Sequence, residues 1–167
     1  MVIENAVYIL DADVFIRAAR DYYAFDINPQ FWEKLVLLAE AGRIASVDKV
    51  KLELDRGNDA LKQWVNQRFS KAFKSCDDEE VTTAFADTMK WVNAQQQFAI
   101  AAKSDYASKA DGWLVAYAKA KDCVIVTQEK YAREVRNRVP IPNICKAFDV
   151  TCVDTFEMLR NLGVVFL

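Results

Sequence analysis

The sequence predicts an α/β fold built on a mostly parallel sheet. Short apolar runs with the length of buried strands alternate with longer segments that have the roughly 3.6-residue spacing of amphipathic helices. Parallel strands are buried on both faces, so a continuous apolar run is the pattern expected of them. Three such runs each precede a helical pattern, and they are Val7 to Leu10, Cys123 to Thr127 and Thr151 to Val153. This alternation indicates strand–helix units and hence parallel pairing.

Length and composition indicate one globular domain over residues 1–167. Hydrophobic residues make up 53% of the 167 residues, which excludes disorder, and no linker or internal repeat interrupts the chain. No apolar stretch approaches the roughly 18 residues that a membrane span needs. The N-terminus lacks the basic region and cleavage site of a signal peptide. We therefore expect a cytoplasmic protein with no membrane partner.

A helix and a second strand are expected after the first strand. The run from Phe31 to Ala41 is amphipathic and stops at Gly42, a residue suited to ending a helix. Ile44 to Val47 has the apolar character of a short strand. Asp48 can then cap a helix that runs to Gly57.

The middle of the chain predicts a helical insert at about residues 58–103. From Asp59 to about Lys103, aromatic and aliphatic side chains recur at helical spacing, with a loop near Ser75 to Asp78. Aromatic side chains in such a pattern are more typical of a core than of a surface that stacks on ligands. The sequence does not define what the insert does.

The last third predicts three helices and two strands in alternation. The expected helices are Ala110 to Lys121, Tyr131 to Arg138 and Asp154 to Leu162. The expected strands are the CVIVT run and Thr151 to Val153. Pro140 and Pro142 indicate a loop before the last strand.

The absence of histidine restricts the chemistry that the chain can perform. It excludes Ser-His-Asp triads, Cys-His pairs, HExxH zinc sites and cleavage of RNA through a cyclic phosphate by histidine acid–base catalysis. The four glycines fit neither the GxGxxG nor the P-loop pattern. The four cysteines form no CxxC pair and predict buried thiols; they are Cys76, Cys123, Cys145 and Cys152.

Acidic side chains lie where the predicted strands end. Asp11 and Asp13 follow the first strand, and Glu129 follows the CVIVT strand. Sites in open α/β sheets form beyond the carboxyl ends of the strands, so we expect these carboxylates to share one edge. Asp111 and Glu53 each lie at the edge of the packed face of a predicted helix. Alone, Asp111 is also interpretable as a helix cap, and Glu53 as part of a solvated charged face.

A cluster of carboxylates near a core indicates a bound cation. At about 5 Å and an effective dielectric of ~20, each like-charge pair repels by roughly 3 kcal/mol. Such a cluster either takes up protons or holds a metal. Oxygen donors without histidine or cysteine favour a hard cation, so we expect Mg²⁺ or Mn²⁺.

The segments YILDADVFI, VKLELD, KADGWLVAYAKAKDCVIVTQE and TCVDTFEML resemble PIN-domain nucleases, in order and across nearly the whole chain. The family pattern has an Asp after the first strand, a Glu on an early helix, an Asp opening a later helix, and a strand ending in Thr-x-acid. The positions that match in turn are Asp11, Glu53, Asp111 and Glu129. The stretch FDINPQFWEKL and the aromatic insert are similar to a PIN-like subgroup of unknown function related to VapC toxin ribonucleases.

The resemblance implies a PIN-like three-layer α/β/α fold and a metal-dependent endoribonuclease, whose products carry 5′-phosphate and 3′-hydroxyl ends. It also implies an RNA substrate, a toxin role with an antitoxin protein as partner, and a homodimer. Two positions depart from the pattern. Asp13 stands where the family usually has Asn, Ser or Thr, and either caps the following helix or extends the metal shell. Glu129 is longer than the usual Asp, so we expect it to bind metal through water or to lie in the outer shell.

Other residues have weaker signals. Thr127 either orients a ligand or closes a strand. Candidate contacts to a phosphate backbone are Arg17, Lys130, Arg133 and Arg136, although such residues also make ordinary solvated faces. With a net charge of −2 the chain has no overall attraction to RNA, so binding requires a local patch or the metal.

Two other functions are compatible with parts of the pattern. Asp11-Ala-Asp13-Val14 also resembles the opening motif of haloacid-dehalogenase-like phosphatases, with Asp11 as nucleophile, Asp13 as acid and Thr127 as the second motif. That interpretation leaves Glu53 and Asp111 without roles. The other alternative is a non-catalytic PIN-like module that binds protein or RNA, although a pure binder has no need of mutually repelling carboxylates.

Overall fold

The computed structural model describes residues 4–57 and 59–167. Within these ranges a central sheet has the strand order β3-β2-β1-β4-β5, and every pair of neighbours is parallel. The strands are β1 (Tyr8–Leu10), β2 (Ile44–Val47), β3 (Phe73–Lys74), β4 (Val124–Val126) and β5 (Cys152–Val153). The predicted parallel sheet is confirmed.

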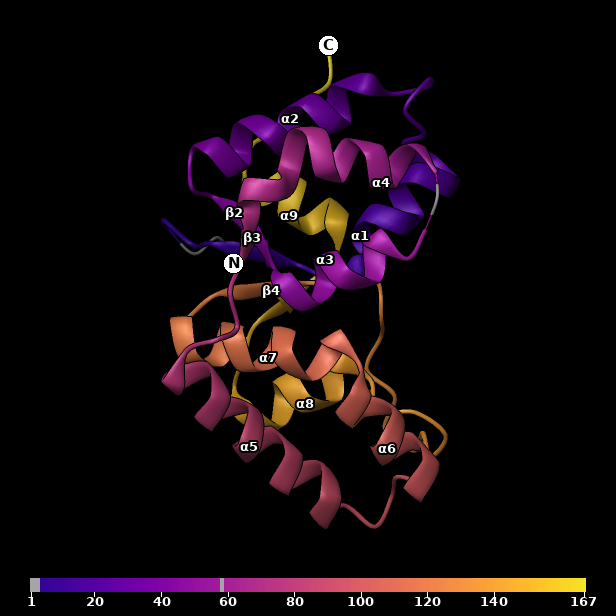
Figure 1. Cartoon of the computed structure of the whole chain (residues 1–167), viewed down its shortest axis with the longest axis vertical. Helices are drawn as coiled ribbons and strands as arrows, with labels where there is room; N and C mark the ends of the chain where they lie inside the picture. Colours follow the sequence, from indigo (N-terminus) through magenta and orange to yellow (C-terminus); the bar gives the residue numbers. More distant parts are fainter. Residues whose placement is uncertain (1–3, 58) are drawn as a thin grey trace.

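Helices cover both faces of the sheet (Figure 1). One layer contains α1 (Ala12–Arg17), α2 (Pro29–Glu40), α4 (Ala60–Trp64) and α9 (Thr155–Asn161), together with the π-helical turns η1 (Ala18–Tyr22) and η2 (Val65–Phe69) and the 3₁₀ turn η3 (Ser70–Ala72). The other layer contains α5 (Glu79–Ala94), α6 (Ile100–Ser108), α7 (Ala110–Lys121) and α8 (Ile141–Phe148). Helix α3 (Asp48–Asp55) contacts both layers, through α1 and α7. This is the three-layer α/β/α arrangement that the sequence predicts.

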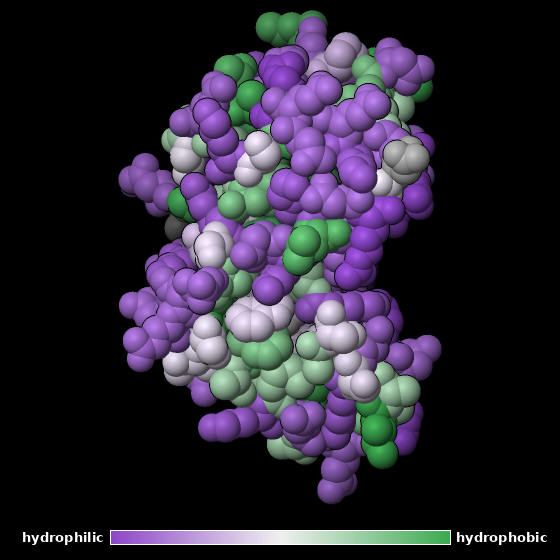
Figure 2. All heavy atoms as spheres, viewed as in Figure 1, coloured by the Kyte–Doolittle hydropathy of each residue, from purple (hydrophilic) through white to green (hydrophobic). Residues whose placement is uncertain are grey.

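The core lies between the central strands and the two helical layers. All three residues of β1 are buried, as expected for a central parallel strand. In the first layer Phe15 of α1 packs on Trp64 and Phe69 of the insert, with ring centroids 6.3 and 5.5 Å apart. The aromatic residues of the insert therefore belong to the core here, as predicted. In the face shown in Figure 2, the surface over α2 and α4 is mostly hydrophilic, and the outline narrows at the level of the sheet.

The insert is not purely helical, which corrects the prediction for residues 58–103. Phe73 and Lys74 form the edge strand β3, which pairs with Ser46 and Val47 of β2. A strand of two residues has no periodicity, and its partner is distant in sequence, so no local pattern identifies it. The expected loop near Ser75 to Asp78 is present. Residue 58, the expected start of the insert, lies outside the described residues.

The helix predicted at Tyr131 to Arg138 is wrong. The chain from β4 to α8 is an irregular loop, and the helix begins at Ile141, inside the stretch predicted as a loop. The Asn143 side chain accepts a hydrogen bond from Ala132 N (3.0 Å) and donates one to Ala132 O (2.8 Å), so it occupies main-chain groups that a helix would pair. Pro142 lies in the first turn of α8, where its missing N–H costs nothing.

Two smaller features complete the comparison with the sequence. Asp48 does not cap α3, because the cap position is Val47 and the Asp48 carboxylate accepts instead from Cys76 N at 3.3 Å. The four cysteines are free thiols; Cys76 and Cys145 are buried, as predicted, whereas Cys123 and Cys152 are only partly buried. In the described part of the chain, no helix combines the length and the apolar character needed to cross a membrane.

The close packing of α5 and α6 against Gly112 predicts a steric penalty. A Cβ atom at Gly112 would lie 2.9 Å from Cε2 of Phe85 and 3.1 Å from Cζ of Tyr106. We expect Gly112→Ala to lower the free energy of unfolding by about 1–3 kcal/mol, measured by urea denaturation. The control is Gly57→Ala, whose nearest contact would be 3.4 Å and which should change stability by less than about 0.5 kcal/mol. Equal effects of the two substitutions would contradict the prediction.

Candidate metal centre

The carboxyl ends of β1 and β4 bring Asp11 and Thr127 together. Asp11 caps α1 through a hydrogen bond from Ala12 N to Oδ1 (2.7 Å). The Thr127 hydroxyl donates to Asp11 Oδ2 at 2.9 Å. Both side chains are buried, with 6% and 3% of their surface exposed. Thr127 is compatible with both predicted roles, because its hydroxyl holds Asp11 and its N–H donates to Val153 O (3.0 Å) at the end of the strand.

Asp13 is tied to the segment that follows β4 and does not cap a helix. Its Oδ2 accepts a hydrogen bond from Gln128 N at 3.0 Å and lies 3.2 Å from the Thr127 hydroxyl. Its Oδ1 is buried and has no hydrogen-bond partner among the described residues. A buried carboxylate oxygen without a donor is costly, and a cation is one group that can satisfy it.

Glu53 links α3 to the beginning of α7. Its Oε1 accepts a hydrogen bond from Ala110 N, the first residue of α7, at 3.2 Å. Glu53 thus performs the capping that Asp111 alone could have been expected to perform. Asp111 lies in the first turn of α7 and is half-buried. Asp111 is therefore not the helix cap, and Glu53 is not simply part of a solvated charged face.

Glu129 makes the same kind of contact with the next helix. Its Oε2 accepts a hydrogen bond from Ile141 N, the first residue of α8, at 2.9 Å. Arg138 lies 3.9 Å from its other oxygen. A carboxylate at a helix N-terminus interacts favourably with the helix dipole, which offsets part of its burial.

The carboxylates raise one another's pKa values. Burial raises the pKa of Asp11 well above its usual range, and the charges of Asp13, Asp111 and Glu129 raise it further. Burial, together with the charges of Glu129 and Glu53, raises the pKa of Asp111 to about 7. Burial also raises the pKa of Asp13 and of Glu129. The positive charges of Arg17, Lys109 and Arg138 lower some of these pKa values but do not outweigh the effects that raise them.

These residues fit a hard cation by their chemistry. All donors are carboxylate or hydroxyl oxygens, the charges repel one another, and Asp13 Oδ1 has no partner among the described residues. As arranged, however, the described residues contain no group of three acids or thiols close enough to hold one ion. Glu53 and Glu129 instead direct an oxygen to the main chain of Ala110 and Ile141.

The predicted basic residues have exposed side chains. Arg17 is paired with Asp21 at 2.6 Å, and Lys130 lies 3.9 Å from Asp154. Arg133 and Arg136 have no ion pair with any residue in 4–57 or 59–167. Both arginines lie in the loop between β4 and α8, which is hydrogen-bonded at Ala132 to the side chain of Asn143.

Gln128 is a site residue that the sequence analysis missed. Its main-chain N–H holds Asp13, and its side-chain amide donates to the Tyr22 hydroxyl (2.7 Å) and to the Thr155 hydroxyl (2.6 Å). It thereby connects the acidic centre to η1 and α9. Gln128 is the variable position of the Thr-x-acid pattern, so nothing in the sequence singles it out.

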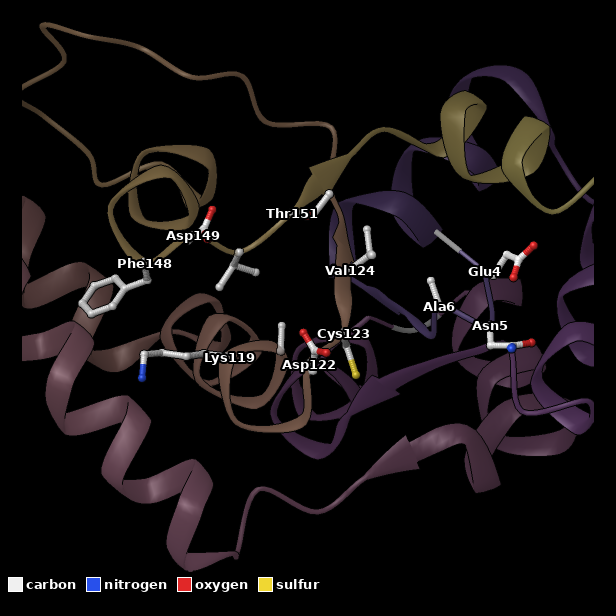
Figure 3. A pocket seen from close by; sticks show the side chains of 12 residues that line it. Glu4, Asn5, Ala6, Lys119, Asp122, Cys123, Val124, Phe148, Asp149 and Thr151 are labelled. Atoms are coloured by element: carbon white, nitrogen blue, oxygen red, sulfur yellow. The ribbon is translucent and has the colours of Figure 1, made fainter. Parts of the chain in front are cut away.

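A different hollow lies at the opposite edge of the sheet (Figure 3). It has a volume of about 220 Å³, and Asp122 and Asp149, which precede β4 and β5, contribute to its lining. It is thus at the amino ends of the strands, away from the acidic centre. Asp149 has a left-handed backbone with φ of 56°, which Asp and Asn tolerate.

Comparisons with solved structures define the class of fold. The chain is similar to VapBC2 from Rickettsia felis, crystallised bound to a DNA fragment from its promoter, with a TM-score of 0.52 and 16% identity over 89% of this chain and 98% of that one. It is similar to FitAcB from Neisseria gonorrhoeae with a TM-score of 0.53 and 15% identity over 90% and 99% of the two chains. The fold is that of a PIN-like, VapC-type protein.

The family follows from the sequence itself. Residues 8–166 match the family model described as a domain of unknown function, DUF4411. The chain belongs to this family. A search of curated proteins found no match.

The raised pKa of Asp111 predicts how stability depends on pH when no metal is present. The folded protein binds this proton more tightly than the unfolded chain, because the pKa rises from 3.8 to about 7. Its stabilising contribution is therefore present at low pH and is lost as pH rises from about 4 to about 7. In EDTA, we expect Asp111→Asn to stabilise the protein at pH 8 by about 2–4 kcal/mol and to have little effect at pH 4.5. Urea denaturation of both proteins across this range is the measurement, and parallel stability curves would contradict it.

Proposed function

We propose that this protein is an Mg²⁺- or Mn²⁺-dependent endoribonuclease. The observation that carries the proposal is the buried Asp11 with the charges of Asp13, Asp111 and Glu129 acting on it at the carboxyl edge of a PIN-like sheet, and one buried oxygen of Asp13 left without a donor among the described residues. Carboxylates such as Asp11 and Asp111, whose pKa values are raised by burial and by neighbouring charges, are candidates for an active site when they lie at the carboxyl edge of an open α/β sheet.

Each residue has a role in this proposal. Asp11, Asp13, Glu53 and Asp111 would hold the metal, with Glu129 beside them or in the outer shell. When bound, the ion would supply Lewis acidity and lower the pKa of a water for attack on a phosphodiester. The Thr127 hydroxyl orients Asp11 (2.9 Å), and Glu53 fixes the start of α7 and hence the position of Asp111. The products would carry 5′-phosphate and 3′-hydroxyl ends.

The loop from Lys130 to Arg138 is the proposed contact with the RNA backbone. It begins beside Glu129, and its cationic side chains are exposed. Gln97 donates to the carbonyls of Arg133 (2.9 Å) and Val135 (2.7 Å), so the loop is held in place from α5–α6 as well as from α8. A fixed loop loses less conformational entropy on binding than a mobile one. Arg17 would contribute to RNA binding only after its ion pair with Asp21 is broken.

We also propose that the chain is the toxin of a toxin–antitoxin pair, with an antitoxin protein as partner and with a homodimer as its own assembly. The support is likeness of fold to chains of the VapBC2 and FitAcB complexes. Co-expression with the product of a small neighbouring gene, followed by size-exclusion chromatography, tests the partner.

One observation favours a phosphatase of the haloacid-dehalogenase type as the second candidate. The Thr127 hydroxyl lies within hydrogen-bonding distance of both Asp11 and Asp13, so the residues that resemble the first and second motifs of that family are adjacent. The phosphatase leaves the burial of Asp111 beside Glu53 and Glu129 without a purpose, so we rank it lower. A covalent phosphate on Asp11 would identify it. A non-catalytic binding module, the third candidate, likewise leaves the repulsion between these acids unexplained.

The nuclease activity is tested by cleavage of a mixed RNA substrate in Mg²⁺ or Mn²⁺. We expect Asp111→Asn to lower the cleavage rate at least ~100-fold, because it removes a charged ligand from the proposed centre. EDTA should abolish cleavage by the wild type.

The matched control for that experiment is Asp149→Asn at the opposite edge of the sheet, which makes the same chemical change and should retain wild-type activity. Cleavage that survives equally in Asp111→Asn would place the activity elsewhere or in a contaminant. Absence of cleavage by the wild type, with metal binding confirmed, would favour a binding role.

The basic loop is tested by the salt dependence of RNA affinity in the Asp111→Asn background. We expect Arg133→Ala with Arg136→Ala to make the slope of log K against log salt less steep by about 1.4, which corresponds to ~0.7 for each lost phosphate contact on a single strand. The control pair is Lys71→Ala with Lys74→Ala, two exposed cations near β3. An unchanged slope in the loop variant would mean that these arginines only form a solvated face. Fluorescence anisotropy with labelled RNA measures the affinities.

A further inference from the structure

A second hollow adjoins the acidic centre along one wall. It has a volume of about 270 Å³ and lies between α1 with η1, the end of α3 and the beginning of α4. Ile16, Ala19, Leu54 and Leu61 form its apolar floor, and Arg20 and Arg56 stand at its exposed rim. We refer to this hollow as the side pocket.

Glu53 is shared by the side pocket and the acidic centre. It lines the hollow, and its Oε1 accepts the hydrogen bond from Ala110 N beside Asp111. On the other wall, Ile16 lies one helical turn after Asp13, on the same face of α1. If the scissile phosphate of a nucleic acid lay at the acidic centre, the neighbouring nucleotide would therefore lie in the side pocket.

The chemistry of the side pocket suits one nucleotide unit. Its volume of about 270 Å³ lies just below the roughly 300–1,000 Å³ of most ligand sites, so it suits a single base and not a longer segment. Bases are held in proteins by apolar and guanidinium stacking, while arginine also binds phosphate. Neither Arg20 nor Arg56 has an ion pair within residues 4–57 and 59–167. Asp59, also on the rim, is occupied in capping α4 through Lys62 N at 3.2 Å.

The backbone is irregular at this point. Ala19 and Arg20 belong to the π-helical turn η1, which continues α1. Such turns are rare and occur frequently at functional sites, because they redirect side chains that a regular helix would place elsewhere. The same turn carries Tyr22, whose hydroxyl receives the Gln128 amide at 2.7 Å. One turn therefore serves both the acidic centre and the side pocket.

We propose that the side pocket binds the base of the nucleotide adjacent to the scissile phosphate, with Arg20 and Arg56 contacting that base or its phosphate. The pocket thereby selects which nucleotide can stand next to the cleaved bond. This inference takes its substrate class from the proposed ribonuclease function.

The test uses ¹⁵N-labelled full-length protein in EDTA, titrated separately with AMP, GMP, CMP and UMP. We expect at least one nucleotide to shift the amide signals of residues 16–20 and 53–57. Arg20→Ala should weaken its binding about tenfold, the loss expected for one charge-assisted contact. Ala19→Leu should fill the floor and weaken binding at least as much. The control is Arg160→Ala on α9, an exposed arginine outside the pocket, which should bind like the wild type.

Several outcomes would overturn the proposal. They are the absence of shifts at these amides with all four nucleotides, shifts confined to the loop of residues 130–138, and wild-type affinity in both Arg20→Ala and Ala19→Leu. Arg20→Ala replaces an exposed side chain, so it provides a result even where Ala19→Leu fails to fold. RNA cleavage without nucleotide binding here would refute the side pocket alone. Nucleotide binding here without RNA cleavage would refute the nuclease and leave the pocket in place.

Discussion

The structure depends on how negative charge is held at the carboxyl edge of the sheet. Glu53 and Glu129 each accept a hydrogen bond from the first N–H of a helix, Ala110 in α7 and Ile141 in α8. These contacts fix where two helices of one layer begin, and the helix N-termini offset part of the buried charge. Asp11 does the same for α1 in the other layer. Three acids of the site, Asp11, Glu53 and Glu129, are therefore also helix caps, so removing one of them affects both the site and the fold.

A second set of contacts connects this edge to the rest of the molecule. Thr127 and Gln128 follow β4 and donate hydrogen bonds to Asp11 and Asp13, respectively. The side-chain amide of Gln128 also donates to the hydroxyls of Tyr22 and the buried Thr155. Side chains whose positions are fixed by such contacts lose little freedom when a ligand binds. The charge of Asp13, unusual for a PIN-like protein, is thereby accommodated by a main-chain donor and not by a helix cap.

The sequence predicted the elements that have a local signal and missed those that depend on distant contacts. The strand Ile44–Val47 and the helix Ala110–Lys121 are found as predicted, because both have strong patterns and clear ends. The helix predicted after β4 does not form, because the Asn143 side chain of α8 hydrogen-bonds to the main chain of Ala132. The acids were identified from their positions after strands and at the packed faces of helices, and the family resemblance agreed with them. The partner of Glu53, in contrast, lies 57 residues away and has no sequence signature.

Three departures from ordinary local rules lie at the carboxyl edge of the sheet, although others lie elsewhere, such as the π-helical turn η2 and the buried side-chain atoms of Trp64 and Tyr106 that have no partner in the described part of the chain. Buried acids with raised pKa values, an Asp13 oxygen without a donor among the described residues, and the π-helical turn η1 all adjoin Glu53 or Asp13. Each feature lowers the stability of the fold relative to a regular helix or a neutral side chain at the same position. Proteins tolerate such costs mainly at functional sites, where stability is exchanged for chemistry. Because the same residues border the acidic centre and the side pocket, the chemistry and the choice of substrate are joined in one structural unit.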